Sequence, residues 1–267
     1  MPQTDGPQPP RSYMRRYGAK VVAVLAAFGV LGAVGTRLVS HVFSSADEKL
    51  HAGKPLLIGV RQDPHGGSDG FLLAADSPSG LDTTLRTAHD CDSLMKVAKR
   101  AGAADVNFSI TDLLLEGATL RDVTILDMRA KIVKRGPPLA GAEIGCASAG
   151  SIDALGVAFN LDEQTPVARQ IVESIRPGKP YFQGNVVELK KGEQQPFEVL
   201  ALTNRYYVEW EIEADVRIDN KDRTVTISNH GKPFKITASG KSYARYYEWL
   251  WADQTPHLYI GSTRATG

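Results

Sequence analysis

Three groups of residues have types and spacings that could carry chemistry. Cys91 follows His89 and Asp90 in the run AHDCDS, and a thiol beside an imidazole is one way to make a nucleophile. Carboxylates recur at every second residue from Glu209 to Asp215, and an aromatic run lies near the C-terminus. Each group also has an ordinary structural role that competes with the chemical one.

The chain contains two cysteines, Cys91 and Cys146. In an oxidising compartment, such a pair most simply forms a disulfide. This bond would close a loop of about 56 residues and stabilise the fold by roughly 4 kcal/mol. The alternatives are free thiols, or a metal site to which His89, Asp90 and Asp92 beside Cys91 would contribute, although near Cys146 only Glu143 supports it. We expect the disulfide and no metal site. We also expect no thiol catalysis, because a histidine adjacent in sequence is not thereby a base oriented toward the thiol in space.

The carboxylates alternate with apolar residues, so on a β-strand they share one face at intervals of about 7 Å. The row consists of Glu209, Glu211, Glu213 and Asp215. A calcium site or a glycosidase-like acid pair could be built from such groups. The favoured alternative is a solvated face, paired across the sheet with Arg223 and with Lys190 or Lys191. No catalytic residue is assigned to it.

The aromatic run places five large rings within nine residues: Tyr243, Tyr246, Tyr247, Trp249 and Trp251. On a strand, Trp249 and Trp251 would lie on the same face. If exposed, the run would form a binding surface for sugars or for a partner protein. If buried, it would be part of the core, which is the favoured alternative.

The charge distribution predicts a membrane anchor. Residues 1–20 carry four basic side chains and only Asp5 as an acid, and residues 21–36 carry no charge. Including Arg37, which can reach the headgroups, residues 21–43 are long enough to span a bilayer, for which about 20 residues suffice. Basic residues before the span place the N-terminus in the cytoplasm. The competing interpretations are a cleaved signal peptide and a buried helix of a soluble protein.

We therefore expect a cytoplasmic tail at 1–20, a transmembrane helix at 21–43, a spacer at 44–55 and an extracytoplasmic domain at 56–267. The exported part, residues 44–267, has 26 basic and 29 acidic residues, which argues against a nucleic-acid binder. A phosphate-binding loop, a nucleophile elbow, an HExxH motif and an EF-hand loop are all missing from the sequence. No cofactor is expected.

The exported part reads as mostly β, a sandwich-like fold with one short helix. The helix is expected over residues 92–100, ending at Ala101 and Gly102. Strict alternation over residues 208–219 and a turn at 220–222 predict a long hairpin. A proline- and glycine-rich cluster at 176–180 marks a linker or crossover, which leaves open two lobes at 56–175 and 181–260. The other expected strands are 56–60, 71–74, 106–110, 123–133 with a bulge near Asp127, 152–161, 186–189, 197–201, 224–228 and 234–236.

Residues 113–141, the FNLD segment at 159–162 and residues 210–234 together resemble a set of membrane-anchored exported proteins of Streptomyces and related actinobacteria. From its first to its last residue, the resemblance spans residues 113–234, roughly half of the exported part. It implies a basic tail, one span and a β-rich outer domain, and it carries over no catalytic residue. Some of these proteins have extra cysteines before the tryptophan-bearing strand, where this chain has Arg205–Glu209, so a second disulfide is not expected.

The function expected from the sequence is a non-enzymatic envelope protein of the plasma membrane that binds a protein or glycan partner outside the cell. One alternative is a hydrolase of envelope material that uses Glu211 or Asp215. Another is a structural subunit of a membrane complex, in which Gly29, Gly32 and Gly35 permit close approach of helices.

Overall fold

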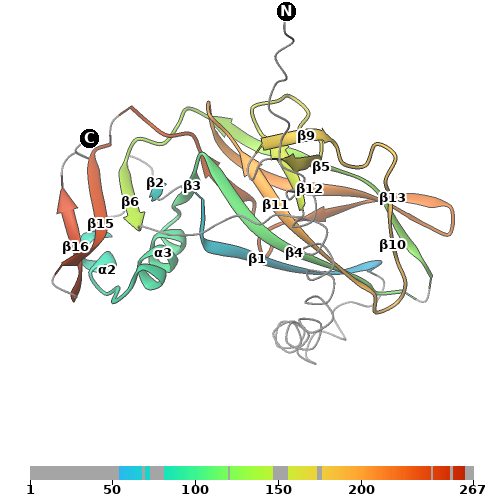
Figure 1. Ribbon diagram of the computed structural model, residues 1–267, viewed down its shortest axis with the longest axis horizontal. Coiled ribbons are helices and arrows are strands. Elements are labelled where there is room, and N and C mark those ends of the chain that lie inside the picture. The colour runs from blue at the N-terminus through green and yellow to red at the C-terminus, as the bar shows by residue number, and fades with distance from the viewer. Residues whose placement is uncertain are drawn as a thin grey trace, which may run out of the picture. The chain divides into compact units, whose positions relative to one another are not determined.

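The computed structural model describes residues 54–67, 70–72, 81–119, 121–146, 156–172, 176–241, 243–252 and 255–261. Residues 53–267 form one compact unit. Its strands make two sheets, as the expected mostly-β, sandwich-like fold requires (Figure 1). The expected membrane helix at 21–43 and the tail before it lie outside the described residues. Within the described part, no helix has the length and apolar character to cross a membrane.

The first sheet has six strands and is antiparallel except for the parallel pair β11–β7. In spatial order its strands are β1 (Leu56–Gly67), β4 (Phe108–Gly117), β11 (Gln194–Leu202), β7 (Gly156–Asn160), β8 (Arg169–Val172) and β9 (Arg176–Pro180).

The second sheet has ten strands, with parallel pairs at β14–β3 and β15–β6. β13 (Lys221–Ile227) pairs with β12, off the main path. The path runs through β10 (Val187–Leu189), β5 (Val123–Gly136), β12 (Tyr207–Ile218), β14 (Phe234–Thr237), β3 (Ala104–Val106), β2 (Gly70–Leu72), β6 (Ala142–Cys146), β15 (Arg245–Ala252) and β16 (Thr255–Gly261).

The long hairpin and the bulge are confirmed. β12 alternates buried and partly exposed residues almost to its end, and Asp219 and Asn220 turn the chain into β13 with positive φ angles of 50° and 59°. Two consecutive positive φ angles are typical of the two-residue turn that fits twisted strands. The pairing of β5 with β12 shifts register beside Asp127, where one additional residue is inserted.

The main core, here called the sandwich core, lies between the two sheets and draws apolar side chains from both. Trp210 of β12 lies at its centre, with ring centroids 5.8 Å from Phe159 of β7 and 5.0 Å from Phe234 of β14. All three rings are at most 2% exposed. Period-2 alternation explains this layer, since every second side chain of a strand points to the same face.

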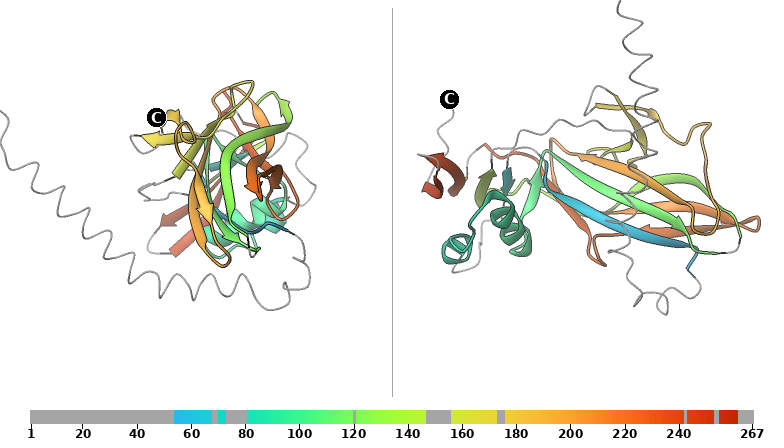
Figure 2. Two further views of the ribbon diagram at one scale, coloured as in Figure 1. Left: turned by 90° about the vertical axis from the view of Figure 1, so that its right-hand side faces the viewer. Right: turned by 60° about the horizontal axis from the view of Figure 1, so that its bottom comes forward.

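A second, smaller core belongs to what we call the helical lobe: the helices α2 (Leu81–Leu85) and α3 (Cys91–Arg100) with strands β2, β6, β15 and β16 (Figures 1 and 2). Leu94, Met95 and Ala98 of α3 face this core, with Ile144 of β6 and Tyr247 of β15 opposite. The predicted helix is confirmed, and it ends at Ala101 and Gly102 as expected. Gly102 adopts a φ of +96°, which favours glycine.

The single strand expected over 106–110 is wrong, because the chain changes sheets at Asn107. β3 before it belongs to the ten-stranded sheet and β4 after it to the six-stranded sheet. Asn107 has a φ of +63°, its amide donates to Thr237 O, and its side chain accepts a hydrogen bond from Ser239 N. Asparagine is one of the few residues that tolerate this conformation, which makes the corner.

The cluster at 176–180 is also not a linker. It is β9, which pairs with β8 at one edge of the six-stranded sheet. Proline cannot donate to a ladder, so edge strands are where Pro177 and Pro180 fit. A division into lobes at 56–175 and 181–260 does not follow the pairing either, because β11 lies between β4 and β7, and β12 lies beside β5.

Candidate functional site

The two cysteines form the expected disulfide. Cys91 and Cys146 are bonded, with their Cα atoms 5.8 Å apart. The bond joins the first residue of α3 to the last residue of β6. The Cys91 thiol is therefore not a nucleophile in this state, and His89 bonds to Thr87 O through Nδ1 at 3.2 Å.

Helix α3 is fixed at both ends. Asp90 caps its start: Asp90 Oδ1 accepts from Ser93 N at 2.6 Å, and the Ser93 hydroxyl accepts from Asp90 N at 3.1 Å. A hydrogen bond from the Ser93 side chain to the carboxylate, followed by the bond from Ser93 N, holds the pKa of Asp90 below its usual value. At the other end, Lys99 and Arg100 occupy the last turn, where cations complement the helix dipole. The covalent anchor at Cys91 and the cap together determine where these two cations lie.

The carboxylate row is paired across the sheet, but with other partners than expected. Three cations of β5 face it, and the pairs are Lys134–Glu209 at 3.9 Å, Lys131–Glu211 at 3.4 Å, Arg129–Glu213 at 2.9 Å and Arg129–Asp215 at 2.5 Å. Arg223 is wrong as a partner because it lies directly opposite Val216 and so points to the other face of the hairpin. Lys190 and Lys191 follow β10, and β5 separates β10 from β12.

This pairing decides what the carboxylates can do. Burial would raise the pKa of Asp215, but hydrogen bonds from Thr224 and Arg129 outweigh it and lower the pKa. A general acid of a glycosidase needs a raised pKa, so that it holds a proton near neutral pH. Asp215 has the opposite shift, and Glu211 and Glu213 are held by cations. The row is an ionic ladder on the sheet surface.

The aromatic run is mainly core. All of its residues except Tyr243 lie on β15, and Tyr246, Tyr247 and Trp249 are 6%, 0% and 5% exposed, so these three do not form a binding surface. Tyr243 is half-buried, and its hydroxyl accepts a hydrogen bond from Gly240 N at 2.9 Å. The side chain of Trp251 lies outside the described part of the chain.

The Tyr247 hydroxyl donates a hydrogen bond to Asp82 of α2, and Arg245 donates to both oxygens of the same carboxylate at 2.8 Å. The bond from Tyr247 is the main cause of a lowered pKa at Asp82. Burial raises the pKa of Tyr247 itself, and the bond to Asp82 raises it further. These contacts attach α2 to β15 and give the buried phenol its partner.

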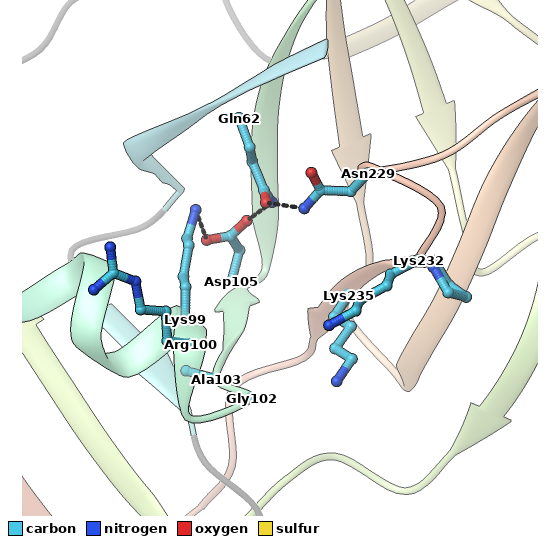
Figure 3. Close-up of a pocket in the computed structure, with 10 residues that line it drawn as sticks. Gln62, Lys99, Arg100, Gly102, Ala103, Asp105, Asn229, Lys232 and Lys235 are labelled. Carbon is cyan, nitrogen blue, oxygen red and sulfur yellow. Dashed lines mark hydrogen bonds and ion pairs between the residues drawn. The ribbon is translucent and has the colours of Figure 1, made fainter. Parts of the chain in front are cut away.

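Sequence reasoning missed one site, a hollow of about 170 Å³ where the two sheets and α3 meet. We call it the cationic hollow (Figure 3). Gln62 reaches it from β1, Lys99 and Arg100 from α3, and Asp105 from β3. The link between α3 and β3 and the β13–β14 segment supply the rest. The full lining is Gln62, Lys99, Arg100, Gly102, Ala103, Asp105, Asn229, Lys232, Pro233 and Lys235.

A polar chain forms one wall of the hollow. The carboxylate of Asp105 is fully buried and pairs with Lys99 Nζ at 3.2 Å. Gln62 Nε2 donates to its other oxygen at 2.7 Å, and Asn229 Nδ2 donates to Gln62 Oε1 at 3.3 Å. Because an ionised carboxylate only accepts hydrogen bonds, it determines which end of the Gln62 amide faces it, and the Gln62 oxygen is left to accept from Asn229. The chain connects β1, β3, α3 and the turn after β13.

The charge of the hollow is unbalanced. Four cations line it against the single carboxylate of Asp105, which Lys99 already pairs. Among the described residues, no carboxylate lies within ion-pair distance of Arg100, Lys232 or Lys235. Figure 3 shows Lys232 and Lys235 on the side of the hollow opposite Lys99 and Arg100. Cations gathered around a concave, partly desolvated surface create a positive potential that attracts anions.

Little in the sequence pointed to this hollow. Lys99 and Lys235 are 136 positions apart in the chain. They come together because β3 pairs in parallel with β14, so that Asp105 lies opposite Ile236. A lysine in the last turn of a helix and two lysines near a turn are each ordinary by themselves. The one local signal is Asp105, a charged residue amid the apolar positions of AADVNF.

Comparison with protein-family models gave no match, and comparison with curated proteins gave none either.

Proposed function

We propose that this chain is a membrane-anchored, extracytoplasmic binding protein without enzymatic activity, and that it binds an envelope component at the cationic hollow. The observation that carries the binding role is the unbalanced charge of the hollow. Arg100, Lys232 and Lys235 line one concavity, and no described carboxylate lies within ion-pair distance of them. Ligand sites are typically concave and carry a few convergent polar groups.

The rigid surroundings of the hollow support the same role. The buried pair of Lys99 with Asp105 and the amide chain through Gln62 and Asn229 hold its wall in one arrangement. A wall that needs no rearrangement loses little entropy when a ligand binds. Binding is therefore favoured by preorganisation as well as by charge.

The disulfide supports the proposed compartment. Disulfides persist in oxidising environments outside the cytoplasm. The bond between Cys91 and Cys146 fits the topology in which residues 1–20 are cytoplasmic and residues 21–43 span the membrane. The resemblance to actinobacterial anchored proteins points in the same direction.

The hydrolase alternative has no supporting observation. Its carboxylates, Glu211 and Asp215, are paired with Lys131 and Arg129 along a strand. A lowered pKa at Asp215 does not suit a proton donor.

Capture from the native envelope tests the proposed function. The full chain, purified in a mild detergent with a C-terminal affinity tag, is incubated with solubilised envelope, and the bound material is identified by mass spectrometry. Replacing Lys232 and Lys235 by glutamate should abolish capture of a specific component. The matched variant K191E/K221E changes the charge equally at two exposed lysines outside the hollow and should retain capture.

Two outcomes contradict this proposal. One is that the wild-type chain captures no component above the level of an unrelated tagged protein. The other is that both charge-reversed variants capture the same components as the wild type. A separate protease-accessibility experiment on spheroplasts checks the topology, since cleavage of residues 56–267 from the outside is expected.

A further inference from the structure

We infer that the ligand group of the cationic hollow is a phosphate. This inference rests on the proposed binding role and names the chemistry of the ligand. The first step concerns charge. Three cations, Arg100, Lys232 and Lys235, remain after Lys99 is paired with Asp105. A carboxylate offers one negative charge, whereas a phosphate monoester carries about −1.5 to −2 at neutral pH, which matches this set better.

The second step concerns donor geometry. Arg100 lines the hollow, and a turn of its exposed side chain would present the N–H groups of the planar guanidinium to a phosphate in a fork. Lys232 and Lys235 supply compact point charges from the other side of the hollow, as Figure 3 shows. A tetrahedral group with oxygens pointing in several directions can meet donors on both sides, whereas the two oxygens of a planar carboxylate face one way.

The third step concerns size. The hollow measures about 170 Å³. Pockets that enclose whole drug-sized ligands measure roughly 300–1,000 Å³. The hollow therefore suits one small group of a larger molecule, with the remainder of that molecule outside. A phosphate of an envelope polymer and a phosphate of a lipid headgroup both satisfy this condition, and the chemistry they share is what the hollow recognises.

The carboxylate of Asp105 does not oppose the binding of an anion. A buried carboxylate beside an anion site would repel the ligand if it were unpaired. Here Lys99 and Gln62 engage both of its oxygens, and both contacts lie within the wall. Asp105 is therefore a positioning residue that holds Gln62 and, through it, Asn229. The three remaining cations of the lining have no ion-pair partner among the described residues.

The test is a titration of the full chain, in a neutral detergent, with inorganic phosphate, followed by the amide NMR shifts of Gly102 and Ala103. We expect saturable binding that weakens as salt is added. The variant K232A/K235A should bind at least about tenfold more weakly, since each charged contact is lost. The control K191A/K221A removes two exposed lysines elsewhere and should bind as the wild type does. Circular dichroism confirms that both variants are folded.

Four probes then identify the class and source of the phosphate. Dextran bearing phosphate monoesters and vesicles of phosphatidylcholine with a minority of phosphatidic acid present the phosphate monoester on a polymer and in a membrane. Tighter binding to either one supports the inference and identifies the source. Polyglutamate and sulfate are the contrasting anions. Binding of polyglutamate as tight as that of the phosphorylated dextran, or equal affinity for sulfate and phosphate, would overturn it.

The absence of saturable phosphate binding, or equal binding by the two lysine variants, would also overturn the inference. This failure is distinguishable from failure of the proposed function. The wild-type chain would still capture an envelope component through the hollow if only the phosphate assignment were wrong. It would capture nothing if the binding role itself were wrong.

Discussion

The sandwich core and the helical lobe are stabilised in different ways. The sandwich core is built from long alternating strands whose apolar residues meet between two sheets, with Trp210 between Phe159 and Phe234. The helical lobe has a smaller apolar core, and it adds the Cys91–Cys146 disulfide and the Asp82–Tyr247 hydrogen bond.

The difference shows what a small core needs. Burial of apolar area scales with the number of side chains enclosed, so a short helix and short strands gain less than a two-layer sandwich. A covalent bond and a polar tether compensate for this in the lobe. The cationic hollow lies where the two regions meet, with Lys99 and Arg100 from the lobe and Gln62 from β1. Its geometry therefore depends on both kinds of stabilisation.

The largest expected effect is in the sandwich core. Replacing Trp210 by alanine should lower the free energy of unfolding by roughly 5 kcal/mol, because it empties the centre of a packed layer. Chemical denaturation followed by circular dichroism measures this change. Val133 on neighbouring β5 is 48% exposed, so V133A is the matched control and should change stability little. Equal losses in the two variants would contradict the assigned core.

Removing the disulfide should have the next largest effect, and local opening of the folded chain should increase most in the lobe. The double variant C91A/C146A is expected to lose roughly 4 kcal/mol, since a long loop is freed in the unfolded chain. Hydrogen exchange should accelerate in α3 and remain slow in β12. Equal acceleration of hydrogen exchange in α3 and β12 would show that the helical lobe and the sandwich core unfold as one cooperative unit. That result would contradict their separate stabilisation.

The features that could be predicted from the sequence are those that depend on contacts between residues close together in the chain. The β12–β13 hairpin was predictable because the alternation and the turn are local. Helix α3 was predictable because its apolar spacing and its stop at Gly102 lie within one short segment. The disulfide followed from the number of cysteines and the expected compartment.

The rest depends on pairings between distant segments. The change of sheet at Asn107 interrupts an apparently continuous alternation from Val106 to Ile110, and nothing local distinguishes a corner from a strand. The partners of the carboxylate row were wrong because the order of β10, β5 and β12 in the sheet was unknown. The cationic hollow needed the parallel pairing of β3 with β14, which has no local signature.

A smaller effect is expected at the tether of α2. Replacing Tyr247 by phenylalanine removes its hydrogen bond to Asp82 and should cost about 1 kcal/mol with little change in packing. The bond lowers the pKa of Asp82 below 3.8, so its stabilisation is complete above that pH and is lost as the pH falls through the lowered pKa. Acid unfolding of Y247F should therefore show a weaker dependence on pH in this range than the wild type. An identical pH dependence would contradict this role of the bond.

The smallest effect is expected on the ionic ladder. Lys131 and Glu211 are joined at 3.4 Å, and the Lys131 side chain is half exposed. The variant K131A should lose less than about 0.5 kcal/mol, as solvent screens such pairs. Thermal unfolding at low and high salt measures it, and the difference from the wild type should shrink as salt is added. A loss of unfolding free energy as large as that of Y247F would mean that the ladder contributes more to stability than a solvent-screened surface pair does.

Photo-crosslinking in native membranes tests the central claim, binding at the cationic hollow, most directly. A photoreactive residue replaces His230, which is exposed in the turn between Asn229 and Lys232. The control position is Lys221 at the far end of β13, roughly 20 Å away along the strand. The account predicts a specific adduct at position 230 that is lost in the K232A/K235A background, and none at position 221. Adducts of equal yield at the two positions, or no adduct at position 230, would contradict it.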